Sequence, residues 1–227
     1  SGFLREILVG NKFSDVYRDS FTLAFTIPDL VYNLLIGGSI QSAITPSLSS
    51  WINNNEEKRG CRAVSIFISV FASILFVVCI LGVVFSDFIY KLYSSGNSNP
   101  ETIHLAAMAS KWLFPQIFFM MLAALCIGIL NAYKRFGSTS FGPTIYNVFV
   151  LLSILIFAGN DEKSLVRCTA GIMVAAIIYF LFQYIIGFDK LKQIRFIFKP
   201  TDKNFIKLLK TAIPVLISSS IVSSTIS

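Results

Sequence analysis

Two pairs of adjacent opposite charges near the start of the sequence, Arg5-Glu6 and Arg18-Asp19, have the residue types of an anion-binding site. A guanidinium is planar, remains charged, and offers parallel N–H donors that match two oxygens of a phosphate or diphosphate. The carboxylates can pair with the guanidinium groups, for example Asp19 with Arg5, and so reduce the cost of placing them in a membrane. The pattern predicts a cationic cavity for a phosphorylated head group.

A second interpretation of these four residues stays open at this point. An arginine at the centre of a membrane span costs about 2.5–3.5 kcal/mol on insertion scales. Both pairs could instead lie at the membrane interface, where long side chains extend to water. The residue types alone do not decide between a cavity and an interface.

No constellation typical of an enzyme accompanies these charges. His104 is the only histidine, and Gly37-Gly38 lacks the strand and the lysine of a phosphate-binding loop. The serines have no histidine–aspartate partners that would make a nucleophile. Four widely spaced cysteines have the spacing of neither a metal site nor a disulfide framework, so we expect them to be packing residues. We therefore expect no enzymatic activity, no cofactor and no metal.

The composition requires a membrane. Of 227 residues, 55% are hydrophobic and 14% are charged, with a mean hydropathy of +0.72, whereas about a quarter of the residues of a soluble domain are charged. Five uncharged runs of 21 to 26 residues follow one another from Asp29 onward, and about 20 apolar residues cross a bilayer as a helix. The runs lack the alternation of barrel strands. The sequence predicts an all-α integral membrane protein with a bundle of about six to seven transmembrane helices.

We expect the spans to differ in surroundings. The run from Asp29 to Asn55 contains glycine, proline and polar residues, which predicts a helix inside the bundle, although small residues could serve only helix packing. Both ends of the sequence have the appearance of interrupted spans. The predicted spans are 1–13 (truncated), 15–50, 63–93, 103–133, 139–159, 166–188 and 205–227 (truncated).

Basic residues predict the orientation. Three alternate connections carry 12 lysines and arginines, and the opposite connections carry four, or five if Lys111 lies outside its span. Cytoplasmic loops are enriched in these residues, so we expect the richer connections and the N-terminus to be cytoplasmic. The net charge of +7 follows from this topology and does not indicate nucleic-acid binding. The basic connector Asp189–Lys210 could be an amphipathic helix on the membrane surface or a solvated loop.

Several motifs in order resemble one known family. The start of the sequence is similar to a GF-x-R-[DE]-x motif, followed by a DAF-like element and an AF-x-[LI]-P-N-L element. The motifs correspond to Gly2–Ile7, Asp19-Ser20-Phe21, Ala24–Leu30, Gly38–Pro46, Gly128–Phe136 and Phe141–Asn147. In these residues the sequence resembles the MurJ (MviN) family of the MOP exporter superfamily.

That resemblance implies a fold and a function. Members of the family have about fourteen helices in two lobes, and they move lipid II, the undecaprenyl-diphosphate-linked peptidoglycan precursor, across the bacterial cytoplasmic membrane. This sequence would hold the N-terminal lobe. The family's helix 1 arginine and neighbouring acid fall on Arg5 and Glu6, and its helix 2 aspartate falls on Asp19. Tyr32 and Asn33 occupy positions where many relatives have an arginine pair.

The resulting expectation is lipid II transport by alternating access, with a substrate site at Arg5, Glu6, Arg18 and Asp19. Arg5 would hold the diphosphate, and Asp19 would orient it or join an ion relay. The expected partners are lipid II, membrane lipids and, for the relay, coupling ions. Two alternatives stay open: another MOP-type exporter of a polyprenyl-linked glycan or a drug, and a membrane scaffold subunit that transports nothing.

Overall fold

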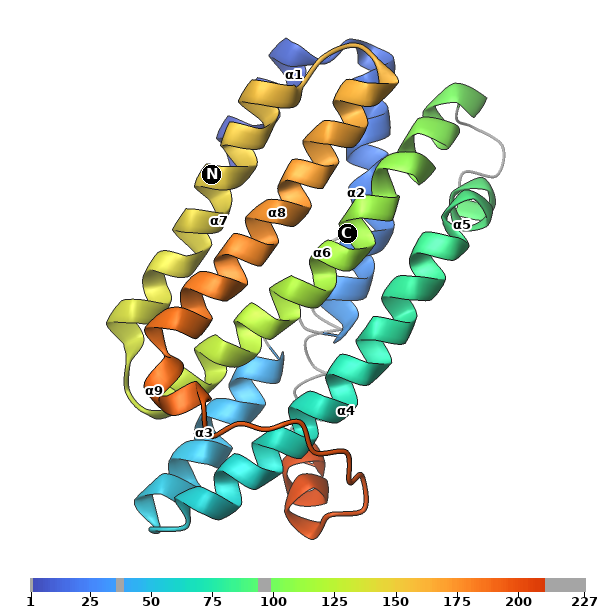
Figure 1. Ribbon diagram of the computed structural model, residues 1–227. Coiled ribbons are helices and arrows are strands. Elements are labelled where there is room, and N and C mark those ends of the chain that lie inside the picture. Colours follow the sequence, from blue (N-terminus) through green and yellow to red (C-terminus); the bar gives the residue numbers. More distant parts are fainter. Residues whose placement is uncertain (1, 36–38, 94–98, 211–227) are drawn as a thin grey trace. The chain divides into compact units, whose positions relative to one another are not determined.

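The computed structural model describes residues 2–35, 39–93 and 99–210, and the described chain is helical without a strand (Figure 1). Four of its helices are long and apolar enough to cross a membrane, which fits the predicted all-α membrane fold. They are α4 (Glu57–Val84), α6 (Pro100–Ala132), α7 (Phe136–Phe157) and α8 (Glu162–Ile186).

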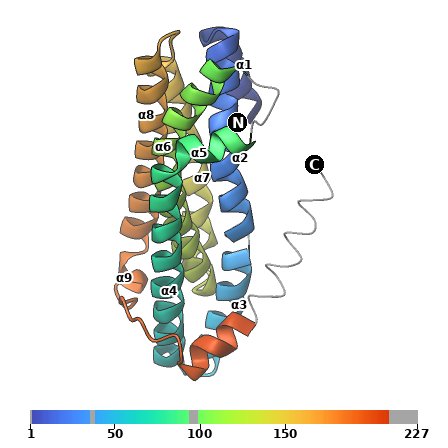
Figure 2. The same ribbon diagram turned by 90° about the vertical axis from the view of Figure 1, so that its right-hand side faces the viewer.

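Two predicted spans are each divided between two helices. The 15–50 span contains α2 (Asp15–Leu35) and α3 (Ser39–Asn53), and residues 36–38 between them lie outside the described part. The 63–93 span is also not continuous, because α4 ends at Val84 and α5 (Ser86–Tyr93) takes a different direction (Figure 2). Asp87 in the first turn of α5 favours a new helix start, since a carboxylate is stabilised near a helix N-terminus.

The chain divides into two compact units. The first comprises residues 1–30, 76–119 and 143–179. Its core joins α1 (Gly2–Lys12) and α2 to parts of α6, α7 and α8 through buried residues such as Phe13, Phe21, Leu113 and Ile172. Lys111 lies within α6, and its Nζ donates to Asp87 Oδ2 of α5 at 3.0 Å.

The second unit comprises residues 31–75, 120–142 and 180–227. Within it α3 packs on α6 by two hydroxyl donors: Thr45 Oγ1 donates to Gly128 O at 3.0 Å, and Ser49 Oγ to Ala132 O at 3.3 Å. Polar residues of the former 15–50 span therefore join two helices, as expected for a helix inside a bundle. The predicted helix 205–227 is described only to residue 210, and residues 203–210 are helical.

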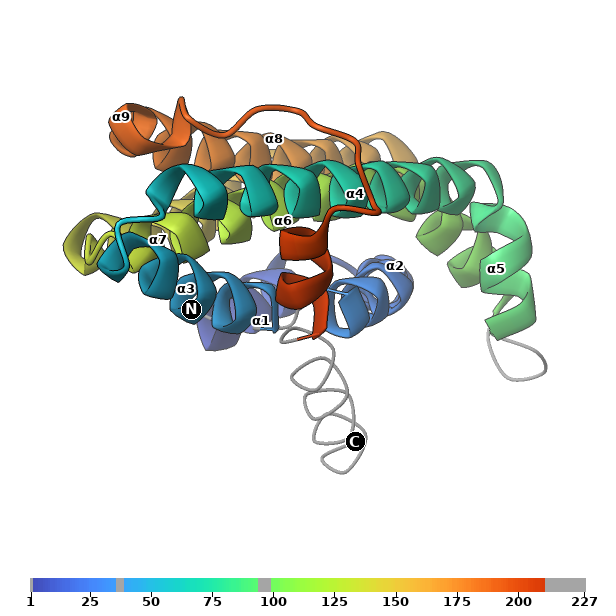
Figure 3. The same cartoon turned by 90° about the horizontal axis from the view of Figure 1, so that it is seen from below.

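The middle of the basic connector of this unit is not a helix. After the four-residue α9 (Phe188–Leu191), residues 194–199 run without regular structure along α4 (Figure 3). Two backbone N–H groups of the connector, of Arg195 and Ile197, donate to Ser65 Oγ at 3.1 Å and to Ser69 Oγ at 2.8 Å. Of the two alternatives left open for this segment, residues 194–199 follow the loop, because serine hydroxyls of α4 accept hydrogen bonds from their backbone, whereas residues 203–210 are helical.

The four cysteines are free and buried, in agreement with a packing role. Cys79 Sγ donates to Phe114 O at 3.0 Å in the first unit. Cys61 Sγ lies 3.6 Å from Tyr133 Oη in the second unit.

Candidate functional site

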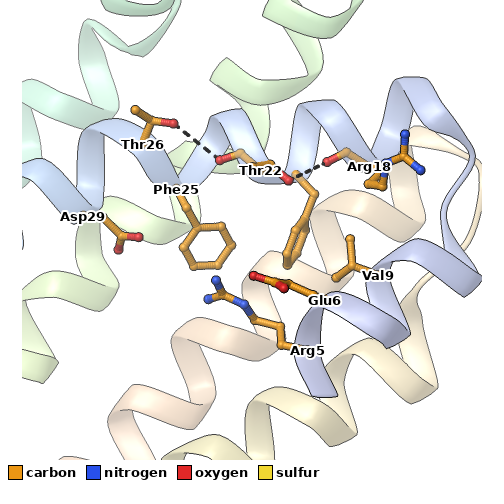
Figure 4. A pocket seen from close by; sticks show the side chains of 9 residues that line it. Arg5, Glu6, Val9, Arg18, Thr22, Phe25, Thr26 and Asp29 are labelled. Carbon is orange, nitrogen blue, oxygen red and sulfur yellow. Dashed lines mark hydrogen bonds between the residues drawn. The ribbon is translucent and has the colours of Figure 1, made fainter. Parts of the chain in front are cut away.

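A pocket of about 360 Å³ in the first unit gathers the charged residues of α1 and α2 (Figure 4). The two helices are held together by aromatic side chains on their facing sides: Phe13 stacks on Phe21 with centroids 5.5 Å apart, and Phe21 meets Phe25 at 5.1 Å. A buried tyrosine of α5 fixes α2 from another side, since Tyr90 Oη donates to Ala24 O at 2.6 Å. The helix pair that carries the site is thus anchored by the core of its unit.

Helical periodicity brings the lining residues to one face. Along α2 the lining residues recur at spacings of three, four, seven, eight and eleven, which is one face of a helix. The α1 residues Arg5 and Val9 are four apart and oppose that face. The lining residues are Arg5, Glu6, Val9, Arg18, Phe21, Thr22, Phe25, Thr26 and Asp29.

Arg5 is half-buried, and its guanidinium lies over the ring of Phe25, 5.4 Å from the centroid. A cation above an aromatic face is attracted by the ring quadrupole, by about 0.5–1 kcal/mol at exposed sites and more when desolvated. Figure 4 shows the guanidinium directed toward Phe25, inside the group of side chains that line the pocket. Glu6, next to it on α1, is exposed and also lines the pocket.

Of the two predicted site residues at the start of α2, Arg18 lines the pocket and Asp19 does not. Arg18 Nη2 lies 2.9 Å from Asp15 Oδ1, and its Nε lies 3.7 Å from Asp19 Oδ1. The structure does not show the expected pairing of Asp19 with Arg5: the ion partner of Asp19 among the described residues is Arg18.

Asp29 is the site residue that reasoning from the sequence missed. It lines the pocket eleven residues after Arg18, and its carboxylate interacts electrostatically with Arg5. The signal was present in the sequence, because Asp29 shares the helix face of Arg18 and takes the place of asparagine in the AF-x-[LI]-P-N-L element.

Two threonines between Arg18 and Asp29 add hydroxyl groups to the same wall. Thr22 Oγ1 donates to Arg18 O at 3.0 Å, and Thr26 Oγ1 donates to Thr22 O at 3.5 Å. The hydroxyl protons are used within the helix, so each oxygen that reaches the pocket can act only as an acceptor. The pocket therefore offers two guanidinium donors, two carboxylates and two hydroxyl oxygens, a set that suits an anionic group of several oxygens accompanied by cationic or hydrogen-bond-donating neighbours.

Comparison with known proteins decides the family. The family model described as Lipid II flippase MurJ matches residues 12–226, nearly the whole chain. The chain belongs to the MurJ family of lipid II flippases. The resemblance found in the motifs is thereby confirmed, and with it the assignment as a multi-pass membrane protein of this bacterial family.

Individual relatives agree with this assignment. The chain is 27% identical over 224 residues to "Probable lipid II flippase MurJ" of Buchnera aphidicola subsp. Schizaphis graminum, covering 96% of the chain and 43% of that protein. It is 28% identical over 185 residues to "Lipid II flippase MurJ" of Burkholderia cenocepacia, covering 81% of the chain and 36% of that protein. The chain thus spans about two fifths of these MurJ proteins.

A solved structure shows the same fold. The structure titled "Lipid II flippase MurJ, inward closed conformation" superposes with a TM-score of 0.69 at 24% identity, over 96% of this chain and 46% of that one. The predicted fold, an all-α bundle of membrane helices, is confirmed by this match.

Proposed function

We propose that this chain takes part in moving lipid II across the bacterial cytoplasmic membrane, and that the pocket between α1 and α2 binds the diphosphate of that lipid. Membership of the MurJ family supports the substrate, and the observation that carries the site is the half-buried Arg5 guanidinium held over Phe25 inside a charged pocket. Transport by alternating access is the mechanism that the family relationship favours.

Arg18 supplies the second cation of the proposed site. Tyr32 and Asn33 stand where many relatives have an arginine pair, so part of the positive charge expected from the family is absent from those positions. In this chain a second guanidinium lines the pocket from the start of α2. Two arginines facing one pocket can each contribute two N–H donors to a diphosphate, whereas a single arginine would leave one phosphate group uncompensated.

The basic connections support a membrane orientation. All 12 lysines and arginines of the three richer connections belong to the second unit. We infer that these connections face the cytoplasm, because Lys and Arg are enriched in cytoplasmic loops. By the parity of the spans, α1 would then begin on the cytoplasmic side. Coupling ions and a relay through Asp19 remain part of the proposal.

The decisive experiment is complementation of a flippase-depleted strain by the protein at its full natural length. Arg5→Ala should abolish growth while the protein still inserts, and Arg5→Lys should give partial growth at best, because lysine keeps the charge and loses the two parallel donors. Lys12→Ala is the matched control: Lys12 is an exposed cation of the same helix outside the pocket. Normal growth with Arg5→Ala at normal expression would remove Arg5 from the site.

A further inference from the structure

A second hollow of the first unit, formed by α6, α7 and α8, is almost entirely apolar and has a volume of about 550 Å³. Small residues of α8 form part of its wall, among them Ala170 and Gly171. Gly171 marks a close approach of two helices, because an added Cβ would lie only 2.2 Å from Ser153 Oγ of α7. The larger side chains that flank this approach leave a trough between α7 and α8.

The trough has the length of one membrane leaflet. Its α8 residues Arg167, Gly171, Val174 and Ile178 are spaced by four, three and four, so they follow a single helix face. Eleven residues of α-helix rise about 16 Å. The hydrocarbon core of a bilayer is about 30 Å thick, so one leaflet contributes about 15 Å. The trough is therefore about as long as an acyl chain that extends from the head group to the bilayer midplane.

One end of the trough is polar. Arg167 lies there, exposed, near the start of α8, and within the described part of the chain it forms no ion pair. Trp112 of α6 also lines the trough and is 39% exposed; tryptophan is enriched where hydrocarbon meets head groups. The charge of Arg167 acts on the carboxylate of Asp161. The pKa of Asp161 is lowered mainly by the hydrogen bond from Ser164 and further by this charge.

We propose that this trough is a binding site for a membrane phospholipid, with the lipid phosphate on Arg167 and one acyl chain lying between α7 and α8. A guanidinium at one end of an apolar channel one leaflet long is complementary to the charge and length of a phospholipid. A docked protein helix fits less well, since it would cover Arg167 without a partner for its charge. The site shares no residue with the pocket of α1 and α2 and does not depend on its function.

Photolabelling tests the proposal with the protein at its full natural length, reconstituted in vesicles of phosphatidylethanolamine and phosphatidylglycerol. The probe is phosphatidylglycerol with a photoactivatable group in one acyl chain, and labelled residues are mapped by mass spectrometry. We expect labels concentrated on the trough residues of α7 and α8. Arg167→Gln and Val174→Trp should each reduce this labelling by about fivefold, by removing the phosphate contact and by filling the channel.

Two matched controls keep the test specific. Lys163→Gln removes an exposed cation one turn before Arg167 and outside the trough, and Val77→Trp enlarges a 54% exposed residue of α4 outside it. Neither should change the trough labelling. A matching phosphatidylcholine probe shows whether the phosphate suffices or an anionic head group is required, and labelling by either supports the site.

Several results would overturn the proposal. One is labelling of the trough at no more than the density found around Val77, which is ordinary contact with bulk lipid. Another is undiminished labelling in Arg167→Gln, an exposed position where folding is not at risk. A third is loss of labelling on addition of a polyprenyl phosphate but not of phospholipid, which would assign the channel to a prenyl chain.

Discussion

Arg5 of α1 and Asp29 of α2 face the same pocket, and the charge of Arg5 acts on the Asp29 carboxylate (Figure 4). Arg5 therefore has an acidic group of the protein nearby before any anionic ligand arrives. A diphosphate that enters must compete with this carboxylate, which lowers its affinity and eases its release. For a transporter, weaker binding is useful because the substrate has to leave on the other side.

Replacement of Asp29 by asparagine tests this competition. We expect Asp29→Asn to bind a lipid-linked diphosphate about fivefold more tightly, because a partly exposed ion pair contributes up to about 1 kcal/mol and a tenfold change in affinity corresponds to about 1.4 kcal/mol. Asparagine is also the residue of the family motif, so the variant should fold. Binding is measured by native mass spectrometry of the protein with lipid II.

The control for that variant is Glu162→Gln, which removes an exposed acid of α8 away from the pocket and should leave the affinity unchanged. Weaker binding in Asp29→Asn would contradict the competition and would indicate that Asp29 instead positions Arg5. The two outcomes have opposite signs, so the measurement decides between them.

The sequence predicts which residues are charged, but not which side of its helix each of them faces in the folded protein. Arg5 and Arg18 were singled out because an arginine within an apolar segment is costly whatever direction it takes, and they line the same pocket together with Glu6. Asp19 was assigned to the site by its family motif, but it does not line the pocket, and its ion partner among the described residues is Arg18. Asp29 was missed because the direction of its side chain becomes evident only once the α1-facing side of α2 is known.

The fold shows a similar division. Uncharged runs predicted α6, α7 and α8 to within a few residues, since hydropathy measures burial in lipid. The end of α4 at Val84 was not predicted, because the apolar run continues to Ser86 and hydropathy contains no information on helix direction. The sequence could not decide between helix and loop for the connector, because the hydrogen-bond partners of its backbone, Ser65 and Ser69, lie about 130 residues away in the sequence.

Orientation can be tested by cysteine labelling in intact cells. Single cysteines at Asn54 and Lys203, both exposed residues of the second unit, should resist a membrane-impermeant maleimide and react after permeabilisation. Background should be low, because the native cysteines are buried. A cysteine at Lys163, in a connection predicted to face the other side, should react without permeabilisation. Reaction at Asn54 or Lys203 in intact cells would reverse the proposed orientation.

The contact between the connector and α4 predicts a local change in hydrogen exchange. Ser65→Ala with Ser69→Ala removes the oxygens that accept from the N–H groups of Arg195 and Ile197. Each lost bond is worth about 1 kcal/mol, so exchange across residues 193–199 should accelerate by about fivefold. Hydrogen–deuterium exchange with mass spectrometry measures the peptide directly.

Ser73→Ala is the matched control for the two serine variants. Ser73 lies one turn further along the same helix, and its hydroxyl donates to Ser69 O within α4. The change should leave exchange of the connector unaltered. Equal acceleration by Ser73→Ala would show that α4 was loosened as a whole, and an unchanged connector in the double variant would contradict the contact.

Gly82 offers a test of packing within the first unit. A Cβ added at this residue of α4 would lie 2.4 to 2.7 Å from ring atoms of Phe114, a fully buried side chain of α6. Since the ring cannot move without displacing the core, Gly82→Ala should destabilise the protein by about 1–3 kcal/mol, the usual cost of overpacking. Gly137→Ala, where nothing lies within 4 Å of the added Cβ, should be neutral or slightly stabilising. Thermal unfolding in detergent compares the two variants, and an equal melting temperature for both would show that α4 and α6 do not approach as closely as the structure has them.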